Sequence, residues 1–256
     1  MNDDWDFYLC QIESKPASMM LDMGIRGQIP MPAFPDMAYL RLYLQTPAAS
    51  GMTTSEEAEI LHPFEDTLGI LAKESKAIYV GRVTTDGFRD FVFYAADGAA
   101  FESEIASTAA TFAGYRFDVG SRPDPEWALY RDYLYPSGRM RQVMKNRGVY
   151  EALSKEGDAL AASREVEHWA YFPTPYARTA FIQNCLKEGF QARSMLEPED
   201  EAEEFGVTIF RQDVPSPAGL DDVTVMLFDL AEAAGGRYDG WETQIQRAGL
   251  APGRAR

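Results

Sequence analysis

The chain has 256 residues, of which 46% are hydrophobic and 25% are charged. This composition is typical of a globular protein and excludes wholesale disorder, and the length favours two domains over one. The 40 acidic and 24 basic residues give a net charge of −16, which disfavours binding to a nucleic-acid backbone and favours basic protein surfaces as partners.

Cysteine usage and the terminus indicate the cellular compartment. Cys10 and Cys185 are far apart in the sequence and predict neither a disulfide framework nor a metal quartet. The first residues, MNDDWDF, carry acids where a signal peptide carries bases, and no apolar run approaches the roughly 18 residues of a membrane span. Glycine-rich phosphate loops are also missing. We therefore expect a cytoplasmic protein that binds no metal and no organic cofactor.

The first half of the sequence predicts alternating strands and helices. Hydrophobic alternation favours strands at 6–13 and 37–45, and a capping box at Thr53 and Thr54 begins a helix that extends to Ser75 and is expected to kink at Pro63. The pair Asp86-Gly87 predicts a tight hairpin, because these residues readily adopt positive φ. The remaining predicted elements are strands at 78–84, 88–94 and 115–119 and a helix at 101–113.

Helical segments are expected at 126–134 and 138–154, after a proline-rich turn. The following residues are small and polar and have no periodic apolar face. We therefore predict a first domain at 1–156, a linker at 157–167 and a second domain at 168–256.

The second half is more regular. Strands are expected at 168–172, 190–196, around 205–209 and at 238–246, with helices beginning at Pro175 and Pro217. The resulting order, β-α-β-β-α-β, is that of a ferredoxin-like unit. The segment 37–119 has the same order. The sequence therefore predicts an α+β protein of two tandem ferredoxin-like α/β sandwich domains, the first extended at both ends.

Few residues suit acid–base catalysis near neutral pH. The two histidines, His62 and His168, lack neighbours of triad type, so a structural role is favoured for each. An enzyme remains an alternative, with a cleft between the domains lined by Asp118, Asp124 or Asp239. A third alternative is an adaptor that joins two proteins, one on each domain.

Acidic residues are the most prominent chemical feature. Six of the eight residues between the second and third strands of the C-terminal domain are acids: Glu197, Glu199, Asp200, Glu201, Glu203 and Glu204. The simple interpretation is a solvated hairpin loop that opposes edge pairing; the functional interpretation is a docking patch for a basic partner. The segment 139–147 is an exception to the acidic character of the chain, because it is rich in basic residues. We expect these residues to pair with the chain's own acids.

A motif near the C-terminus carries a family resemblance. The helix ending Ala234-Gly235-Gly236 and the following Tyr238-Asp239-Gly240-Trp241 resemble the end of the regulator of ribonuclease E activity B family. The segment Lys187-Glu188-Gly189-Phe190 and the acidic hairpin are also similar, over about 167–246. The resemblance implies a non-enzymatic protein that binds ribonuclease E outside its catalytic region and restrains RNA decay. Tyr238, Asp239 and Trp241 are then partner-binding candidates, whereas an Asp-Gly turn and a packed indole are the structural alternative.

The first half resembles a domain family of unknown function that is often found beside that regulator. The residues that carry this resemblance are 81–87, leading to Phe93-Tyr94, and 124–130, leading to Leu134-Tyr135-Pro136. Simple members of the regulator family lack such a domain. The preferred hypothesis is therefore a cytoplasmic inhibitor of an RNA-processing endoribonuclease, whose acidic C-terminal domain binds a basic protein surface and no nucleic acid.

Overall fold

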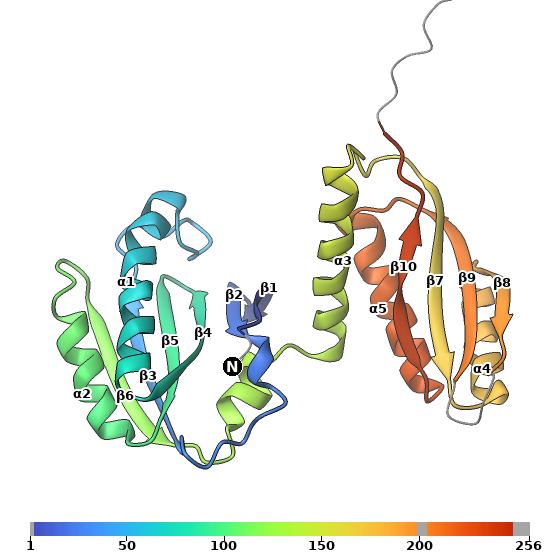
Figure 1. Cartoon of the computed structure of the whole chain (residues 1–256). Coiled ribbons are helices and arrows are strands. Elements are labelled where there is room, and N and C mark those ends of the chain that lie inside the picture. Colours follow the sequence, from blue (N-terminus) through green and yellow to red (C-terminus); the bar gives the residue numbers. More distant parts are fainter. Residues whose placement is uncertain (1–2, 199–203, 248–256) are drawn as a thin grey trace, which may run out of the picture. The chain divides into compact units, whose positions relative to one another are not determined.

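The computed structural model describes residues 3–198 and 204–247. The chain divides into two compact units, Met1–Pro136 and Ser137–Arg256, and each is described by itself (Figure 1). None of the helices within the described ranges combines the length and the apolar character needed to cross a bilayer.

The first unit is a six-stranded antiparallel sheet with two helices. Its elements are β1 (Trp5–Ile12), β2 (Lys15–Asp22), η1 (Met23–Ile25), β3 (Asp36–Tyr43), α1 (Ser55–Glu74), β4 (Ala77–Thr85), β5 (Phe88–Ala95), α2 (Gly98–Ala109), β6 (Phe117–Pro123) and the π-helical η2 (Leu129–Leu134). The strand order is β1-β2-β4-β5-β3-β6. The segment from β3 to β6 thus forms the predicted ferredoxin-like unit, and the hairpin β1–β2 extends its sheet beyond β4.

Local chemistry explains where these elements begin and turn. The hydroxyl of Thr54 accepts a hydrogen bond from the backbone N–H of Glu57 and caps α1. Helix α1 continues through Pro63 as one element. Between β4 and β5, Asp86 and Gly87 both have positive φ, 44° and 83°, which confirms the predicted hairpin.

The second unit is a four-stranded antiparallel sheet in the order β10-β7-β9-β8. Its elements are α3 (Gly138–Lys155), β7 (Arg164–Phe172), α4 (Pro175–Lys187), β8 (Gln191–Leu196), β9 (Phe205–Asp213), α5 (Pro217–Ala233) and β10 (Arg237–Thr243). Helices α4 and α5 bury Phe181 and Leu227 against inward-facing side chains of β7 and β9. This order is the same as that of β6-β3-β5-β4 in the first unit, so the prediction of two tandem ferredoxin-like sandwiches is confirmed.

Helix α3 belongs to the second unit, which differs from the expected boundary at 157–167. Tyr150 and Leu153 of α3 are buried against Leu220 of α5 and Trp241 of β10. The N-terminus of α3 approaches α5 closely, because a Cβ at Gly138 would lie 2.5 Å from the ring of Phe228. The two units therefore meet in sequence at Pro136 and Ser137.

The segment expected to be a linker is tied into the second unit. The carboxylate of Asp158 accepts hydrogen bonds from the backbone N–H groups of Leu160 and Gln246. It also forms an ion pair of 2.6 Å with Arg164, and both side chains are buried. The polar composition of the segment hides this anchoring, because it depends on one buried carboxylate and on the apolar side chain of Leu160, which packs against the core formed with α3, α5 and β10.

Candidate functional site

The acidic loop predicted from the sequence joins β8 to β9 at one end of the second sheet. Glu197 and Glu204 stand at its two ends and are described by the structure, whereas Glu199, Asp200, Glu201 and Glu203 lie outside the described residues. All six residues of β8 are exposed, and β8 forms the edge of the sheet. The acidic loop thus follows an open strand.

Arg178 fixes the base of the acidic loop. This side chain comes from α4 and is buried, although it stands in the helix stripe that otherwise buries Phe181 and Cys185. Its guanidinium donates to the carbonyl oxygens of Leu196 at 3.1 Å and Gly206 at 3.3 Å, and to Glu197 at 2.6 Å. The last residue of β8 and the start of β9 are therefore held together. Sequence reasoning missed Arg178; a cation within an apolar helical stripe is the signal that indicates it.

A second arginine holds the other end of the acidic loop. Arg237 donates to Glu204 at 2.7 Å and to Asp239 at 2.8 Å. Its guanidinium also lies over the ring of Tyr171, 4.3 Å from the centroid. Glu197, Glu204 and Asp239 are thus already engaged by arginines, so they are less suited to docking than exposed acids without such partners.

Tyr238 and Trp241 are buried, with exposures of 5% and 7%. The Tyr238 hydroxyl lies 2.8 Å from Nδ1 of His168, and the Trp241 indole N–H donates to Oδ1 of Asn146 at 2.9 Å. In this structure the two rings stabilise the second unit and offer no surface to a partner.

The Asp-Gly pair of this motif lies in a β-bulge, not in the turn considered from the sequence. The pairing of β10 with β7 shifts between Tyr238 and Gly240, leaving Asp239 as the extra residue. A bulge adds one residue to a strand and re-aims the side chains that follow it. Tyr238 and Trp241, three residues apart, therefore both point into the core.

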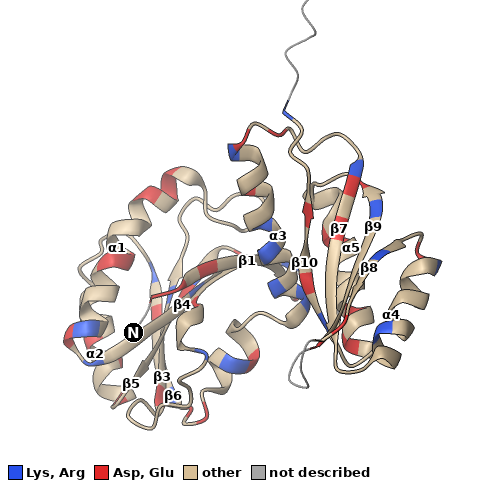
Figure 2. Ribbon diagram, turned by 45° about the vertical axis from the view of Figure 1, so that its right-hand side comes forward, with Lys and Arg blue, Asp and Glu red and all other residues tan. Residues whose placement is uncertain are grey.

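The face of the second sheet opposite α4 and α5 carries three partly exposed aromatic residues, Trp169, Tyr171 and Phe210. Arg193 covers Phe210, with its guanidinium 4.4 Å from the ring centroid, and pairs with Glu165 and Glu167. The period-2 alternation in β7 and β9 places these aromatics outward, and this signal was available in the sequence. Acidic and basic residues both occur along the strands of this sheet (Figure 2).

The basic helix is α3, on which Lys and Arg are prominent in Figure 2. Arg139 pairs with Asp229 of α5 at 2.7 Å, and Arg147 lies 3.9 Å from Glu151. Pairing of these bases with the chain's own acids was expected from the net charge.

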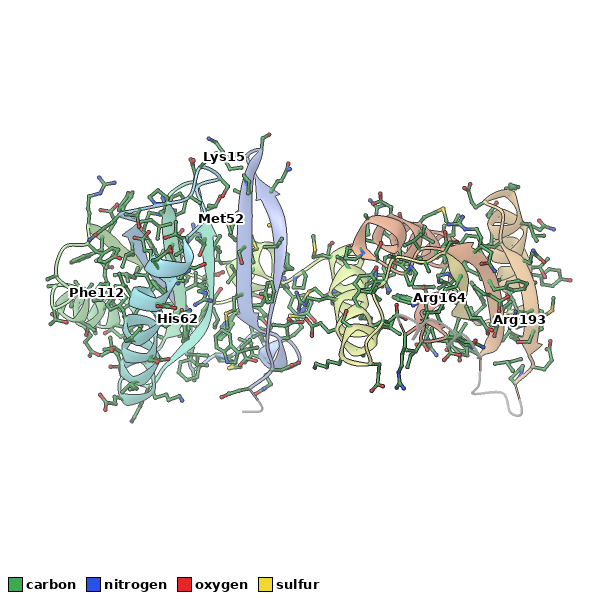
Figure 3. All side chains as sticks on the ribbon, turned by 90° about the horizontal axis from the view of Figure 1, so that it is seen from above. Lys15, Met52, His62, Phe112, Arg164 and Arg193 are labelled. Atoms are coloured by element: carbon green, nitrogen blue, oxygen red, sulfur yellow. The ribbon has the colours of Figure 1, made fainter. Side chains whose placement is uncertain are left out.

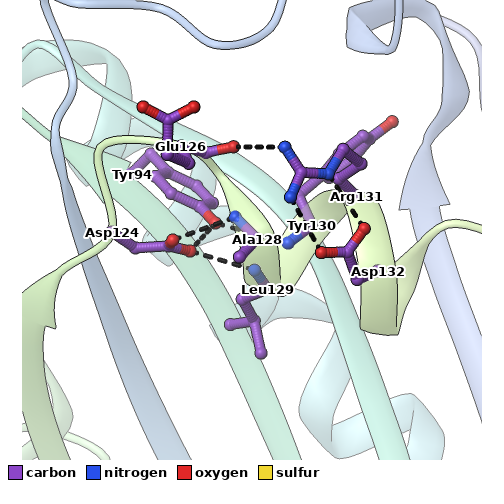
Figure 4. A network of polar contacts seen from close by, with 8 residues as sticks. All are labelled: Tyr94, Asp124, Glu126, Ala128, Leu129, Tyr130, Arg131 and Asp132. Atoms are coloured by element: carbon purple, nitrogen blue, oxygen red, sulfur yellow. Dashed lines mark hydrogen bonds and ion pairs between the residues drawn. The ribbon is translucent and has the colours of Figure 1, made fainter.

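Asp124, one of the carboxylates considered for catalysis, has a structural role. It accepts hydrogen bonds from the Tyr94 hydroxyl at 2.6 Å and from the backbone N–H groups of Ala128 and Leu129 (Figure 4). Burial alone would raise the pKa of this carboxyl, but these hydrogen bonds outweigh it and lower the pKa. The carboxylate thus orders the turn into η2, where Trp127 stacks on Tyr94 at 3.8 Å.

The other carboxylates considered for catalysis are Asp118 and Asp239. Asp118 is on β6 and accepts from the Tyr43 hydroxyl at 2.6 Å, whereas Asp239 belongs to the second unit. No group of three or more His, Cys, Asp or Glu side chains within 3–198 and 204–247 is arranged to hold a metal ion.

The histidines and cysteines differ in burial, and Cys10 on β1 is only partly buried. His168 is buried, and burial together with Arg211 lowers its pKa to about 3. The thiol of Cys185 is also buried, which raises its pKa to about 12. His62 is exposed on α1.

Comparisons with known proteins match both units. Residues 3–135 match a family of unknown function, DUF695, and residues 144–243 match regulator of ribonuclease activity B. No curated protein matches. Among solved structures, an unknown protein from Galdieria sulphuraria is similar at 15% identity, over 80% of this chain and 96% of that chain, with a TM-score of 0.22. The chain, more than half of which matches the first family, belongs to the DUF695 family of unknown function, and residues 144–243 of its second unit match the regulator of ribonuclease activity B family.

Proposed function

We propose that the protein is a non-enzymatic, cytoplasmic regulator that binds a basic segment of a ribonuclease of the E type and inhibits the enzyme. The observation that carries the proposal is the position of the acidic run, between the exposed edge strand β8 and β9 of a domain that matches the regulator family. Exposed charges of one sign attract an oppositely charged partner and raise the association rate.

The internal ion pairs decide which acids are proposed to dock. Glu197 and Glu204 are engaged by Arg178 and Arg237, so their replacement would also loosen the base of the loop. The four acids between them, Glu199, Asp200, Glu201 and Glu203, are therefore the proposed docking residues. Asp239 shares Arg237 with Glu204 and would support them indirectly.

The experiment compares two variants that each remove the same number of negative charges. The docking variant replaces the four middle acids by their amides. The control variant replaces four exposed acids elsewhere in the second unit, Glu188, Asp222, Glu232 and Glu242. Both remove four negative charges from the same unit, so any difference between them reports position and not net charge.

We would measure binding of the non-catalytic region of ribonuclease E to the full chain at low and at physiological salt. The docking variant should associate about tenfold more slowly than wild type and lose most of its salt dependence, whereas the control variant should differ from wild type by less than about threefold. Equal association rates for the two variants would contradict docking by the loop. No binding by folded wild-type protein would remove ribonuclease E as the partner.

A further inference from the structure

The first unit contains a groove of about 800 Å³ between α1 and the hairpin β1–β2. Trp5, Met20, Tyr79 and Arg82 from β1, β2 and β4 line it on one side, and α1 lines it on the other. The hairpin extends the sheet past the strand on which α1 packs, which leaves a concave surface. Its volume lies within the roughly 300–1,000 Å³ of small-molecule sites.

One face of α1 forms the helical wall of this groove. The lining residues recur at the spacing of a single helix face: His62, Glu65, Asp66, Gly69, Ile70 and Lys73. Ile70 is 58% exposed although it lies on this wall, and His62 is labelled on α1 in Figure 3. This face of α1 is therefore directed at the hairpin without being covered by it.

Gly69 places no side chain on the α1 wall of the groove, although glycine lowers the stability of the helix. A glycine inside a helix is less favourable than alanine. A Cβ built on Gly69 meets no atom within 4 Å, and its φ is not positive. Neither packing against the described residues nor backbone conformation requires glycine here, so the missing side chain leaves room in the groove.

The charges of the groove favour a cation. Glu65 is engaged, since it accepts a hydrogen bond from the Tyr79 hydroxyl at 2.8 Å and pairs with Arg82. Asp22 accepts from two backbone N–H groups. Asp3 and Asp66 are exposed at the groove. These two exposed acids outnumber the lysine that lines the groove, Lys73. The first unit as a whole has 21 acidic and 10 basic residues.

The aromatic side chains suit the same kind of ligand. The rings of Trp5 and Tyr79 lie 5.2 Å apart between centroids, at an interplanar angle of 36°. Aromatic side chains offer a large apolar surface against which the body of a ligand can pack. Met20 and Ile70 add apolar surface for the body of a ligand.

We propose that this groove binds a small organic cation, an ammonium group on an apolar body, with the apolar body against Trp5 and Tyr79 and the ammonium group toward Asp3 and Asp66. The proposal concerns the first unit alone and does not depend on the ribonuclease partner of the second.

A matched pair of probes tests the charge preference. 4-Phenylbutylamine and 4-phenylbutyrate share the same apolar body and carry opposite charges. We would titrate each into the full chain by calorimetry and follow the indole N–H signals of the four tryptophans by NMR. The amine should bind saturably, at least about tenfold more tightly than the acid, and should shift the Trp5 signal first. Equal affinity of the two probes, absence of saturable binding, or a shift confined to another tryptophan would overturn the proposal.

Two glycine variants test the location. Gly69→Met would fill the groove while improving helix propensity, so loss of the fold is not expected. Gly148→Met on α3 is the matched control, because a Cβ there also meets no atom within 4 Å. Affinity for the amine should fall at least about tenfold in Gly69→Met and stay unchanged in Gly148→Met, and Asp66→Asn should weaken it about threefold. Full affinity in Gly69→Met would place the ligand elsewhere and overturn the proposal.

Discussion

The indole N–H of Trp241 donates to the side-chain oxygen of Asn146, and this bond of 2.9 Å joins β10 to α3. Asn146 is fully buried, and both the oxygen and the nitrogen of its side-chain amide form hydrogen bonds. Its oxygen also accepts from Gln142 at 3.1 Å, and its nitrogen donates to Asp221 and Thr224 of α5. One amide thus connects three elements of the second unit, which explains why a polar residue is found in this core.

Replacement of Asn146 by alanine should lower the free energy of unfolding by about 2–4 kcal/mol, because the buried Trp241 N–H and its other partners lose their hydrogen bonds. Urea denaturation of the full chain measures this. The control is Asn184→Ala on α4. Among the described residues, the Asn184 side chain is hydrogen-bonded to the exposed Lys187. This variant should stay within about 0.5 kcal/mol of the wild-type free energy of unfolding. Similar losses in the two variants would contradict the role given to Asn146.

The position of the unit boundary predicts which fragments fold. A fragment of residues 137–256 should be a cooperatively folded domain, since it retains α3 over Trp241 and Leu220. A fragment of residues 157–256 loses α3 and exposes that core. Circular dichroism and thermal unfolding should show a sharp transition for the first fragment and a broad one, or none, for the second. A stable shorter fragment would restore the boundary at 157–167.

Stability should depend on pH through His168. Its pKa in the folded state is about 3, whereas an unfolded histidine titrates near 6.5. Between these values the unfolded chain binds more protons than the folded chain, so the free energy of unfolding decreases as pH falls, by about 2 kcal/mol at pH 5. Urea denaturation between about pH 5 and pH 7.5 should therefore give a steeper profile for wild type than for His168→Gln. Carboxylates titrate in both proteins, so parallel profiles would contradict a neutral buried His168.

Asp124 should matter for folding and not for chemistry. Asp124→Ala removes the acceptor of three hydrogen bonds and should destabilise the protein by about 3 kcal/mol, whereas Tyr94→Phe removes one of them and should cost about 1 kcal/mol. Differential scanning calorimetry would separate the two. A stable Asp124→Ala variant would show that the carboxylate is not needed for the turn into η2.

The parts of the fold that depend on local chemistry could be predicted from the sequence. The Asp86-Gly87 hairpin and the Thr54 cap are examples, because turn and cap residues act within a few positions of themselves. Strand β2 was not recognised. Its hairpin with β1 turns on Glu13 and Ser14, which have positive φ of 49° and 66° although neither is the glycine or asparagine that signals such a turn.

The tertiary contacts of a helix or strand were harder to predict than the helix or strand itself. Helix α3 was expected in the correct place but assigned to the wrong unit, because its buried face includes the polar residues Gln142 and Asn146 and so gives no clear apolar stripe. The groove in the first unit was equally hidden. The residues that line it come from α1 and from strands β1, β2 and β4, and only the added hairpin brings them together.

The extra residue at Asp239 lets Tyr238 and Trp241 share one face of the sheet although they are three positions apart in the sequence. A regular strand of the same length would point Tyr238 and Trp241 to opposite faces, since side chains alternate along it. Deletion of Asp239 would leave the two rings two positions apart in a regular strand and both on the core face, and substitution of Asp239 would also keep both in place. In a chain with this motif, a one-residue gap before the tryptophan is consequently the loss of a bulge and not a change of core.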